Sequence, residues 1–289
     1  MKFVLDDDQR DFASTLDSLL AGADTVAVAR AWADGDHDPG LELWSRLAEL
    51  GLLSLATDAT PVEVAIAFEA LGRHAVPGPW VESAAYLPVA LGREVEGVAT
   101  LALPPVVPFA LDADVADAVY VGATPAEPAG EPVGSVDRTR RLFAVPGEAE
   151  VHGEAFELAV LAVSAQLLGA GERILADTVA YARQRRQFGR EIGSYQAIKH
   201  ALADVRIALD FARPLVFGAA LGAVPASAAK VACADAAYLS SRTGLQVHGA
   251  IGYTQELDLS LWLTKVRALV TAWGTPDFHR RRVLEGLAG

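Results

Sequence analysis

The sequence contains a single cysteine, Cys233, and no asparagine. One cysteine excludes a disulfide within the chain and a cysteine-rich metal centre, and it is typical of a reducing compartment. The missing asparagine is compatible with selection against heat-labile residues or with genome composition. We therefore expect a cytoplasmic protein with no metal site.

Positive charge is also scarce, because 24 lysines and arginines face 37 acidic residues and leave a formal net charge of -13. Nucleic-acid binding needs broad basic surface, so nucleic acid is excluded as a partner. No run of eighteen apolar residues is free of charge, so no membrane span is expected. The opening residues MKFVLDDDQRDF are acidic where a secretory signal is basic and then apolar, so no targeting segment is expected.

The spacing of apolar residues predicts three regions. Residues 1–95 show the three- and four-residue spacing of helices and predict an N-terminal helical domain. Residues 96–147 hold four short β-prone runs separated by proline, glycine and aspartate, which predict a reduced, antiparallel β module. Residues 148–289 return to helical spacing and predict a C-terminal four-helix bundle, with helices at roughly 150–186, 194–223, 226–247 and 256–272.

Two motifs in the last region suit a phosphorylated ligand. In RQRRQFGREIGSYQ, residues 183–196, Arg185 precedes Phe188 by three at an expected helix end. An arginine pairs with phosphate through two parallel hydrogen bonds, and phenylalanine offers a flat apolar face. In QVHGAIGY, residues 246–253, Gly249 allows close backbone approach after a helix. Either motif alone also fits a solvated helix end or a turn.

In this order and spacing, YARQRRQFGREIGSYQAIKHALADV and QVHGAIGYTQE resemble the C-terminal helical domain of the acyl-CoA dehydrogenases. The segment EALGRHAVPGPW and the helical, β, helical order extend the resemblance over nearly the whole chain. It implies a mainly α, acyl-CoA dehydrogenase-like fold and FAD as cofactor. It also implies α,β-dehydrogenation of an acyl-CoA thioester, with an electron-transfer flavoprotein or a similar acceptor reoxidising the flavin.

The resemblance also implies which residues bind the cofactor. Family residues that match Arg185 and Phe188 contact the diphosphate and adenosine part of FAD, and those that match Gln196, Gln246 and Gly249 lie in the same neighbourhood. In the family these contacts reach across a subunit interface into a neighbour's flavin site. We therefore expect an FAD that is shared with a partner subunit.

The chain departs from the family at the catalytic base. Many members carry a glutamate before Gly-Thr, and that position is Trp273 here. An indole N–H has no basic lone pair and cannot accept a proton. Because Trp262, Val266, Val270 and Trp273 recur at helical spacing, the pattern predicts that Trp273 belongs to an apolar helical stripe in the core.

No other residue matches a catalytic position. Some members carry the base on an earlier helix, where this chain has Ala159, and Glu157 lies roughly 200° around that helix. Asp277, His279 and Glu256 are near in sequence and are expected to be surface or capping residues. We assign no catalytic residue to this chain.

The predicted β module, residues 96–147, is shorter than in the family and lacks the Thr/Ser-Glu-Pro and Trp-x-Thr/Ser stretches that hold the flavin ring. The chain thus lacks the base and the ring cradle but keeps the residues that reach a neighbour's FAD. This pattern resembles the short, non-catalytic β subunit of heteromeric α2β2 acyl-CoA dehydrogenases of actinobacteria, which act on steroid side chains. A larger catalytic subunit is then expected to bind the acyl-CoA.

Two alternatives stay open from the sequence. One is a self-sufficient homomeric flavoenzyme of the same fold, either a dehydrogenase with a displaced base or a flavin monooxygenase. The missing ring cradle argues against it. The other is a structural subunit without cofactor contact, and the retained spacing of the two motifs argues against that.

Overall fold

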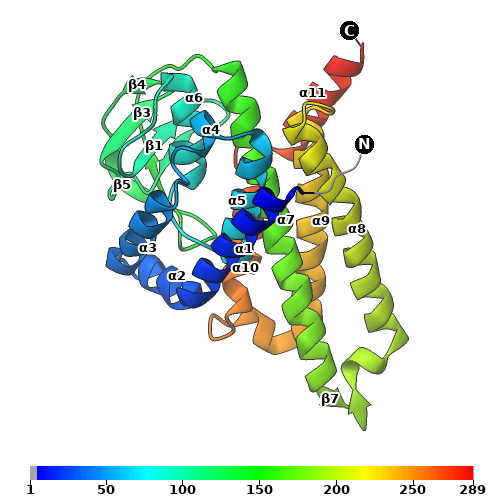
Figure 1. Cartoon of the computed structure of the whole chain (residues 1–289). Helices are drawn as coiled ribbons and strands as arrows, with labels where there is room; N and C mark the ends of the chain where they lie inside the picture. Colours follow the sequence, from blue (N-terminus) through cyan, green and yellow to red (C-terminus); the bar gives the residue numbers. More distant parts are fainter. Residues whose placement is uncertain (1–4, 289) are drawn as a thin grey trace.

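The computed structural model describes residues 5–288. The N-terminal region is helical, as the apolar spacing predicted, and Figure 1 shows it in blue and cyan beside a long central helix. Its segments are α1 (Asp7–Gly22), α2 (Thr25–Ala33), α3 (Asp38–Glu49), α4 (Leu55–Asp58), α5 (Pro61–Arg73), the π-helical η1 (Glu82–Tyr86) and α6 (Leu87–Leu91). Helices α1 and α5 both begin with a capping box, which satisfies backbone donors at their first turns.

The β module contains two small sheets rather than one antiparallel sheet. The strand order is β1-β3-β4 in one sheet and β2-β6-β5 in the other. Strands β1 and β3 are parallel, so the antiparallel prediction is wrong for this pair. Strand β2 lies between β1 and β3 in sequence but belongs to the second sheet. The connection through β2 therefore brings the chain back to the end of the first sheet where β1 starts, and β3 runs in the same direction as β1. The strands are β1 (Ala99–Ala102), β2 (Phe109–Leu111), β3 (Ala118–Val121), β4 (Thr124–Pro125), β5 (Ala129–Gly134) and β6 (Arg141–Ala144).

The C-terminal region contains the four predicted helices, α7 to α10, and one further helix, α11. Helix α11 was not predicted, because it is highly charged and, apart from His279, has no buried residue to form an apolar face. The elements are α7 (Gly153–Gln184), β7 (Arg186–Gln187), β8 (Arg190–Glu191), η2 (Ile192–Ser194), α8 (Gln196–Ala220), α9 (Ala226–His248), η3 (Gly249–Tyr253), α10 (Leu259–Thr271) and α11 (Pro276–Ala288).

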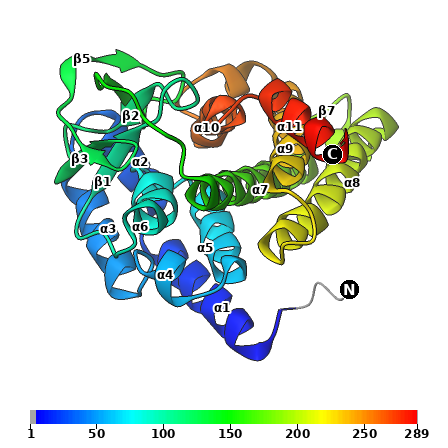
Figure 2. The same cartoon turned by 90° about the horizontal axis from the view of Figure 1, so that it is seen from above.

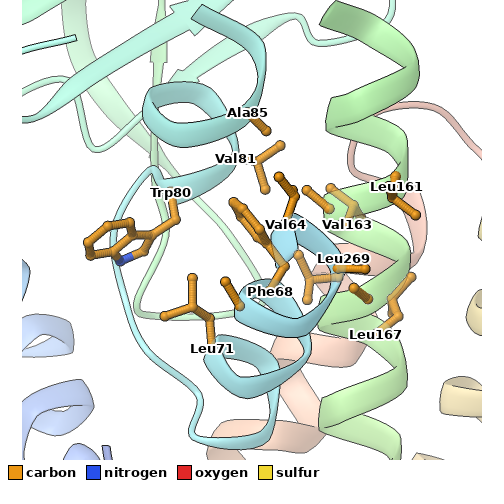
Figure 3. Packing of buried hydrophobic residues seen from close by; sticks show 14 of the residues in the cluster. Val64, Phe68, Leu71, Trp80, Val81, Ala85, Leu161, Val163, Leu167 and Leu269 are labelled. Atoms are coloured by element: carbon orange, nitrogen blue, oxygen red, sulfur yellow. The ribbon is translucent and has the colours of Figure 1, made fainter. Parts of the chain in front are cut away.

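Helix α7 is the centre of the molecule, with α5 on one side and α8, α9 and α10 around the rest (Figure 2). It is long and apolar enough to span a membrane, but 83% of that apolar window is buried inside the chain. A Cβ on Gly169 would lie 1.9 Å from the Glu69 carbonyl oxygen, so α5 and α7 pack at a distance that only glycine permits. Val64 and Phe68 of α5 meet Val163 of α7 in this core (Figure 3).

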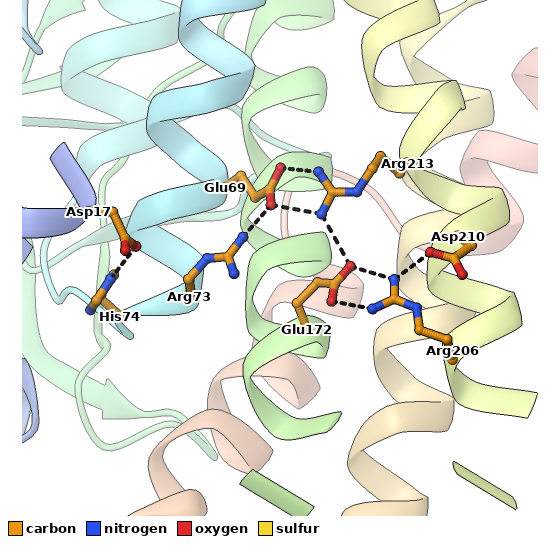
Figure 4. A network of polar contacts seen from close by, with 8 residues as sticks. All are labelled: Asp17, Glu69, Arg73, His74, Glu172, Arg206, Asp210 and Arg213. Atoms are coloured by element: carbon orange, nitrogen blue, oxygen red, sulfur yellow. Dashed lines mark hydrogen bonds and ion pairs between the residues drawn. The ribbon is translucent and has the colours of Figure 1, made fainter. Parts of the chain in front are cut away.

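A network of ion pairs joins α5, α7 and α8 (Figure 4). Arg213 of α8 donates two hydrogen bonds of 2.9 Å to Glu69 of α5 and one of 3.1 Å to Glu172 of α7. Arg206 adds two bonds of 2.7 Å to Glu172. Burial alone would raise the pKa of Glu172, yet the bonds from the two arginines hold it below its ordinary value. The network therefore fixes the N-terminal helices to the bundle.

Candidate functional site

The predicted phosphate-binding motif forms a hairpin at the end of α7. Arg185 is the C-cap residue of α7, and its backbone is extended. Its carbonyl accepts a hydrogen bond of 2.8 Å from the backbone N–H of Ile192. The turn residues Phe188 and Gly189 have φ of 52° and 82°. Two positive φ values in a two-residue turn match the twist of the flanking strands. The hairpin is therefore a short, well-defined projection from the bundle, at the label β7 in Figure 1.

Phe188 is 91% exposed at the tip of this hairpin. A positive φ is uncommon for a bulky side chain and costs free energy, so it persists only where the surrounding structure requires it. Within residues 5–288 nothing covers the ring. The chain thus holds an aromatic face in solvent by means of a strained backbone.

The arginines of this segment differ in their partners. The Arg190 guanidinium lies 3.9 Å from the centre of the Tyr195 ring, and Arg186 donates to the Gly189 carbonyl. Arg183 and Arg185 are exposed, and their side chains make no hydrogen bond or ion pair in the part of the chain that the structure describes. Arg185 is therefore free to bind an anion from outside the chain.

The structure brings the five predicted cofactor residues to one end of the bundle. The ends of α7 and α9 meet there, since the Tyr181 and His248 rings stack with centres 4.2 Å apart. The C-cap of α9 has φ of 63°, a conformation that favours glycine. The five are Arg185 and Phe188 after α7, Gln196 as the first residue of α8, Gln246 in the last turn of α9, and Gly249 as its C-cap. Their role toward FAD stays a prediction.

Trp273 lies at the other end of the molecule. It is only 2% exposed, as expected for a core residue, but α10 ends at Thr271, so the prediction of a helical backbone is wrong here. Its φ is 57°, and its carbonyl is bound at 2.9 Å by the His279 Nε2 atom. Ser227 holds the other ring nitrogen of His279 at 2.9 Å. The two hydrogen bonds of His279 therefore fix the loop between α10 and α11 and position the Trp273 indole.

Glu82, which was not among the predicted site residues, contacts this indole. The Trp273 Nε1 atom donates a hydrogen bond of 3.2 Å to Glu82 Oε1. Glu82 is 3% exposed, and burial raises the pKa of its carboxyl while the charge of Arg140 opposes the rise. One signal was present in the sequence: Glu82 is the only charged residue of the apolar stretch VESAAYLPVAL.

Glu82 and Trp273 line a cavity of about 580 Å³ between the β module and the end of α10. The residues that were considered as bases are not part of its lining. Ala159 is buried in α7, and Glu157 and Asp277 each pair with an arginine of α11. Burial lowers the pKa of His279 to about 4, and both of its ring nitrogens are hydrogen-bonded. Glu256 is exposed.

The two ends of the molecule differ in how well they fit FAD. The bundle end offers a free arginine and an exposed aromatic face, which suit a diphosphate and an adenosine. At the cavity end, the indole of Trp273 fills the position of the expected base, and the ring-holding stretches are missing from the β module. Helix α7 has 32 residues, or about 48 Å, and separates the two ends. One FAD molecule therefore cannot use both ends of one chain.

A family model and a curated relative match this chain. The family model described as acyl-CoA dehydrogenase, C-terminal domain, matches residues 149–288. The protein "Acyl-CoA dehydrogenase IpdE2" of Mycobacterium tuberculosis (strain ATCC 25618 / H37Rv) is 31% identical over 93% of this chain and 94% of its own length.

Two solved structures share the fold. A chain of the ChsE4-ChsE5 complex from Mycobacterium tuberculosis is similar with a TM-score of 0.79 and 22% identity, over 100% of this chain and 99% of that chain. A chain of the Tcur3481-Tcur3483 steroid ACAD is similar with a TM-score of 0.79 and 20% identity, over 98% of this chain and 99% of that chain.

Proposed function

The chain belongs to the acyl-CoA dehydrogenase family, and from this premise we propose that it is a non-catalytic subunit that completes the FAD site of a larger catalytic partner. The predicted mainly α fold of that family is confirmed. The family is one of FAD-dependent oxidoreductases acting on CH–CH bonds. When bound, FAD supplies the acceptor for the two electrons removed from the acyl chain.

The observation that carries the proposal is the contrast between the two ends of α7. At one end Arg185 has no partner in residues 5–288, and Phe188 is held in solvent by a strained backbone. At the other end Trp273 fills the position of the base and donates to Glu82. A second copy of this chain would have the same cavity end and would also lack the stretches that hold the flavin ring. The FAD that Arg185 reaches therefore belongs to a different kind of subunit.

Each of the five residues at the bundle end contacts a different part of the partner's FAD site in this account. The Arg185 guanidinium pairs with the FAD diphosphate through charge-assisted hydrogen bonds, and the Phe188 ring packs against the adenosine part. The amides of Gln196 and Gln246 add polar contacts. Gly249 lets the backbone approach the cofactor closely, because glycine has no side chain at this turn, where φ is 63°.

The partner then carries the catalytic base and the flavin ring, and it binds most of the acyl-CoA. We propose an α2β2 assembly in the cytoplasm, with an acyl-CoA of a steroid side chain as substrate and an electron-transfer flavoprotein or a similar acceptor. The fold shared with chains of the ChsE4-ChsE5 complex and of the Tcur3481-Tcur3483 steroid ACAD supports a heteromer and this substrate class.

The experiment is to purify the chain alone and after co-expression with the acyl-CoA dehydrogenase encoded beside it. We expect no FAD on the isolated chain and FAD together with acyl-CoA oxidation in the complex. One FAD per isolated chain after purification would contradict the proposal.

One observation favours a second candidate, a homomeric dehydrogenase with a displaced base. Glu82 is a buried carboxyl that lines the cavity beside Trp273. This candidate predicts that the homomer alone oxidises an acyl-CoA and that Glu82→Gln abolishes the activity. Oxidation only in the presence of the larger subunit would decide against it.

A further inference from the structure

The cavity between the β module and α10 is lined by three charged residues that differ in exposure. Glu82 is 3% exposed. Arg140, from the segment between β5 and β6, is half-buried. Arg267 of α10 is exposed. The lining thus combines a buried acid with a half-buried and an exposed cation.

Two of these groups lack partners inside the chain. Among residues 5–288, the Arg140 side chain makes no hydrogen bond or ion pair, and Glu82 Oε2 accepts no hydrogen bond from another residue. The flanking arginines of the same segment are paired, Arg138 with Asp34 and Arg141 with Asp114, both at 2.9 Å. A half-buried cation without a partner is costly, so Arg140 is unusual in its own segment.

The net charge of the cavity favours an anion. Its lining holds two arginines, Arg140 and Arg267, and one acid, Glu82, so the ionisable side chains of the lining include more cations than anions. Burial also raises the pKa of Glu82, which disfavours its charged form. A ligand with one negative charge would pair with Arg140 through charge-assisted hydrogen bonds.

The rest of the lining favours an apolar body on that ligand. The side chains between the polar groups are Val106, Val107, Phe109 and Leu142. At about 580 Å³ the cavity falls within the range of small-molecule sites, roughly 300–1,000 Å³.

We propose that this cavity binds an amphipathic organic carboxylate, with the carboxylate paired to Arg140 beside Glu82 and the apolar body against the valine, phenylalanine and leucine side chains. The proposal goes beyond the FAD function, since it concerns the end of the molecule that does not fit the flavin ring. The phosphates of a CoA ester are also anions that can pair with Arg140, and the test distinguishes a carboxylate from these phosphates.

The test is calorimetric titration of the full-length chain with sodium decanoate, and of the complex where the partner is available. Decanol is the neutral probe of similar body, and decanoyl-CoA is the probe with phosphates. We expect decanoate to bind at one site, decanol at least about tenfold more weakly, and decanoyl-CoA no better than decanoate. Equal binding of decanol, or binding of decanoyl-CoA alone, would overturn the proposal.

Two variants and a control locate the site. Arg140→Met keeps the length of the side chain and removes its charge, so decanoate binding weakens about tenfold or more. Thr271→Phe, at an exposed lining residue, obstructs the mouth and weakens decanoate and decanol alike. Arg138→Met, in the same segment but outside this cavity, leaves binding unchanged. Unchanged binding in Arg140→Met overturns the assignment.

The FAD content of the complex is measured on the same samples. We expect Arg140→Met to retain FAD fully, because Arg185 is at the other end of α7. Loss of FAD in Arg140→Met would assign the cavity to the cofactor and overturn the carboxylate site. Loss of decanoate binding with FAD retained supports the site whether or not the shared-FAD function holds.

Discussion

Arg185 and Trp273 lie at opposite ends of α7. Arg185 follows its last residue, and the Trp273 ring is centred 6.1 Å from the ring of Phe156 in its first turn. The helix is about 48 Å long, because its 32 residues rise 1.5 Å each. The residue predicted to bind a cofactor diphosphate and the residue at the position expected for the base are therefore too far apart to serve one FAD in one chain.

The strained turn predicts opposite effects of Phe188→Gly on stability and on cofactor binding. Glycine relieves the left-handed strain of about 1–2 kcal/mol and loses part of the gain to chain entropy, so the isolated chain becomes more stable by about 0.5–1 kcal/mol. The same change removes the exposed ring, so the complex retains FAD less well. Urea unfolding and flavin absorbance measure the two effects.

Phe188→Ala is the matched control for this prediction. Alanine keeps the strained backbone and removes the ring, so FAD retention falls while the free energy of unfolding stays within about 0.5 kcal/mol of the original. If both variants retained FAD fully, the ring would have no part in cofactor binding.

Trp273 is predicted to be a structural residue. Trp273→Ala leaves a cavity and an unpaired Glu82 oxygen, and we expect a loss of about 3–5 kcal/mol in the free energy of unfolding. Trp273→Phe keeps most of the volume and loses the hydrogen bond, so the loss is smaller, about 1–3 kcal/mol. Urea unfolding of the isolated chain measures both. A neutral effect of Trp273→Ala would refute the structural assignment.

His279 predicts a dependence of stability on pH. Burial lowers its pKa from 6.5 to about 4, so the unfolded chain binds a proton more readily than the folded chain between these values. The stability that the neutral, buried His279 contributes is therefore fully present above pH 6.5. It is lost as the pH falls toward 4, by about 3 kcal/mol in total. Unfolding free energies measured between pH 4 and 7 test this.

The comparison variants for this pH dependence are His279→Gln and His200→Gln. We expect His279→Gln to be less stable at pH 7 and to show a flatter profile between pH 6.5 and 4. His200 is exposed on α8, so His200→Gln leaves the profile as it was. An unchanged slope in His279→Gln would show that other groups cause the dependence.

The network of Figure 4 predicts a large effect at Arg213. Glu69 and Glu172 have side chains that are only 10% and 12% exposed, and both form ion pairs with Arg213. Arg213→Met removes one of the positive charges that neutralise these two carboxylates. Because Arg213 itself is 36% exposed, we expect a loss of about 2–3 kcal/mol rather than the full cost of a buried pair. Arg138→Met, at an exposed pair with Asp34, changes stability by less than about 0.5 kcal/mol.

The place of the bundle-end residues in the fold was predictable because helix ends have a local signal in the sequence. Arg185 and Phe188 lie in one short segment, and helical spacing was enough to place the ends of α7 and α9. The same spacing correctly identified Trp262, Val266 and Val270 as core residues. What the spacing measures is a continuous helix face, and that face continues to the last turn of α10.

The contact between Glu82 and Trp273 was not predictable in the same way. The two residues are 191 positions apart in sequence, and each belongs to a segment that reads as apolar. The spacing also extended the α10 stripe to Trp273, because periodicity cannot show that the backbone turns left-handed after Ala272. The parallel pairing of β1 with β3 likewise depends on which sheet β2 joins.

The most direct test of the central claim compares two neighbouring arginines of the same exposed segment. The dissociation constant of FAD is measured for the complex that contains Arg185→Gln and for the complex that contains Arg183→Gln. Arg185→Gln should weaken FAD binding about tenfold or more, the effect of losing a charge-assisted hydrogen bond of ~1.5–3 kcal/mol, and Arg183→Gln should not. Equal FAD affinity in both variants and in the unmodified complex would contradict the account.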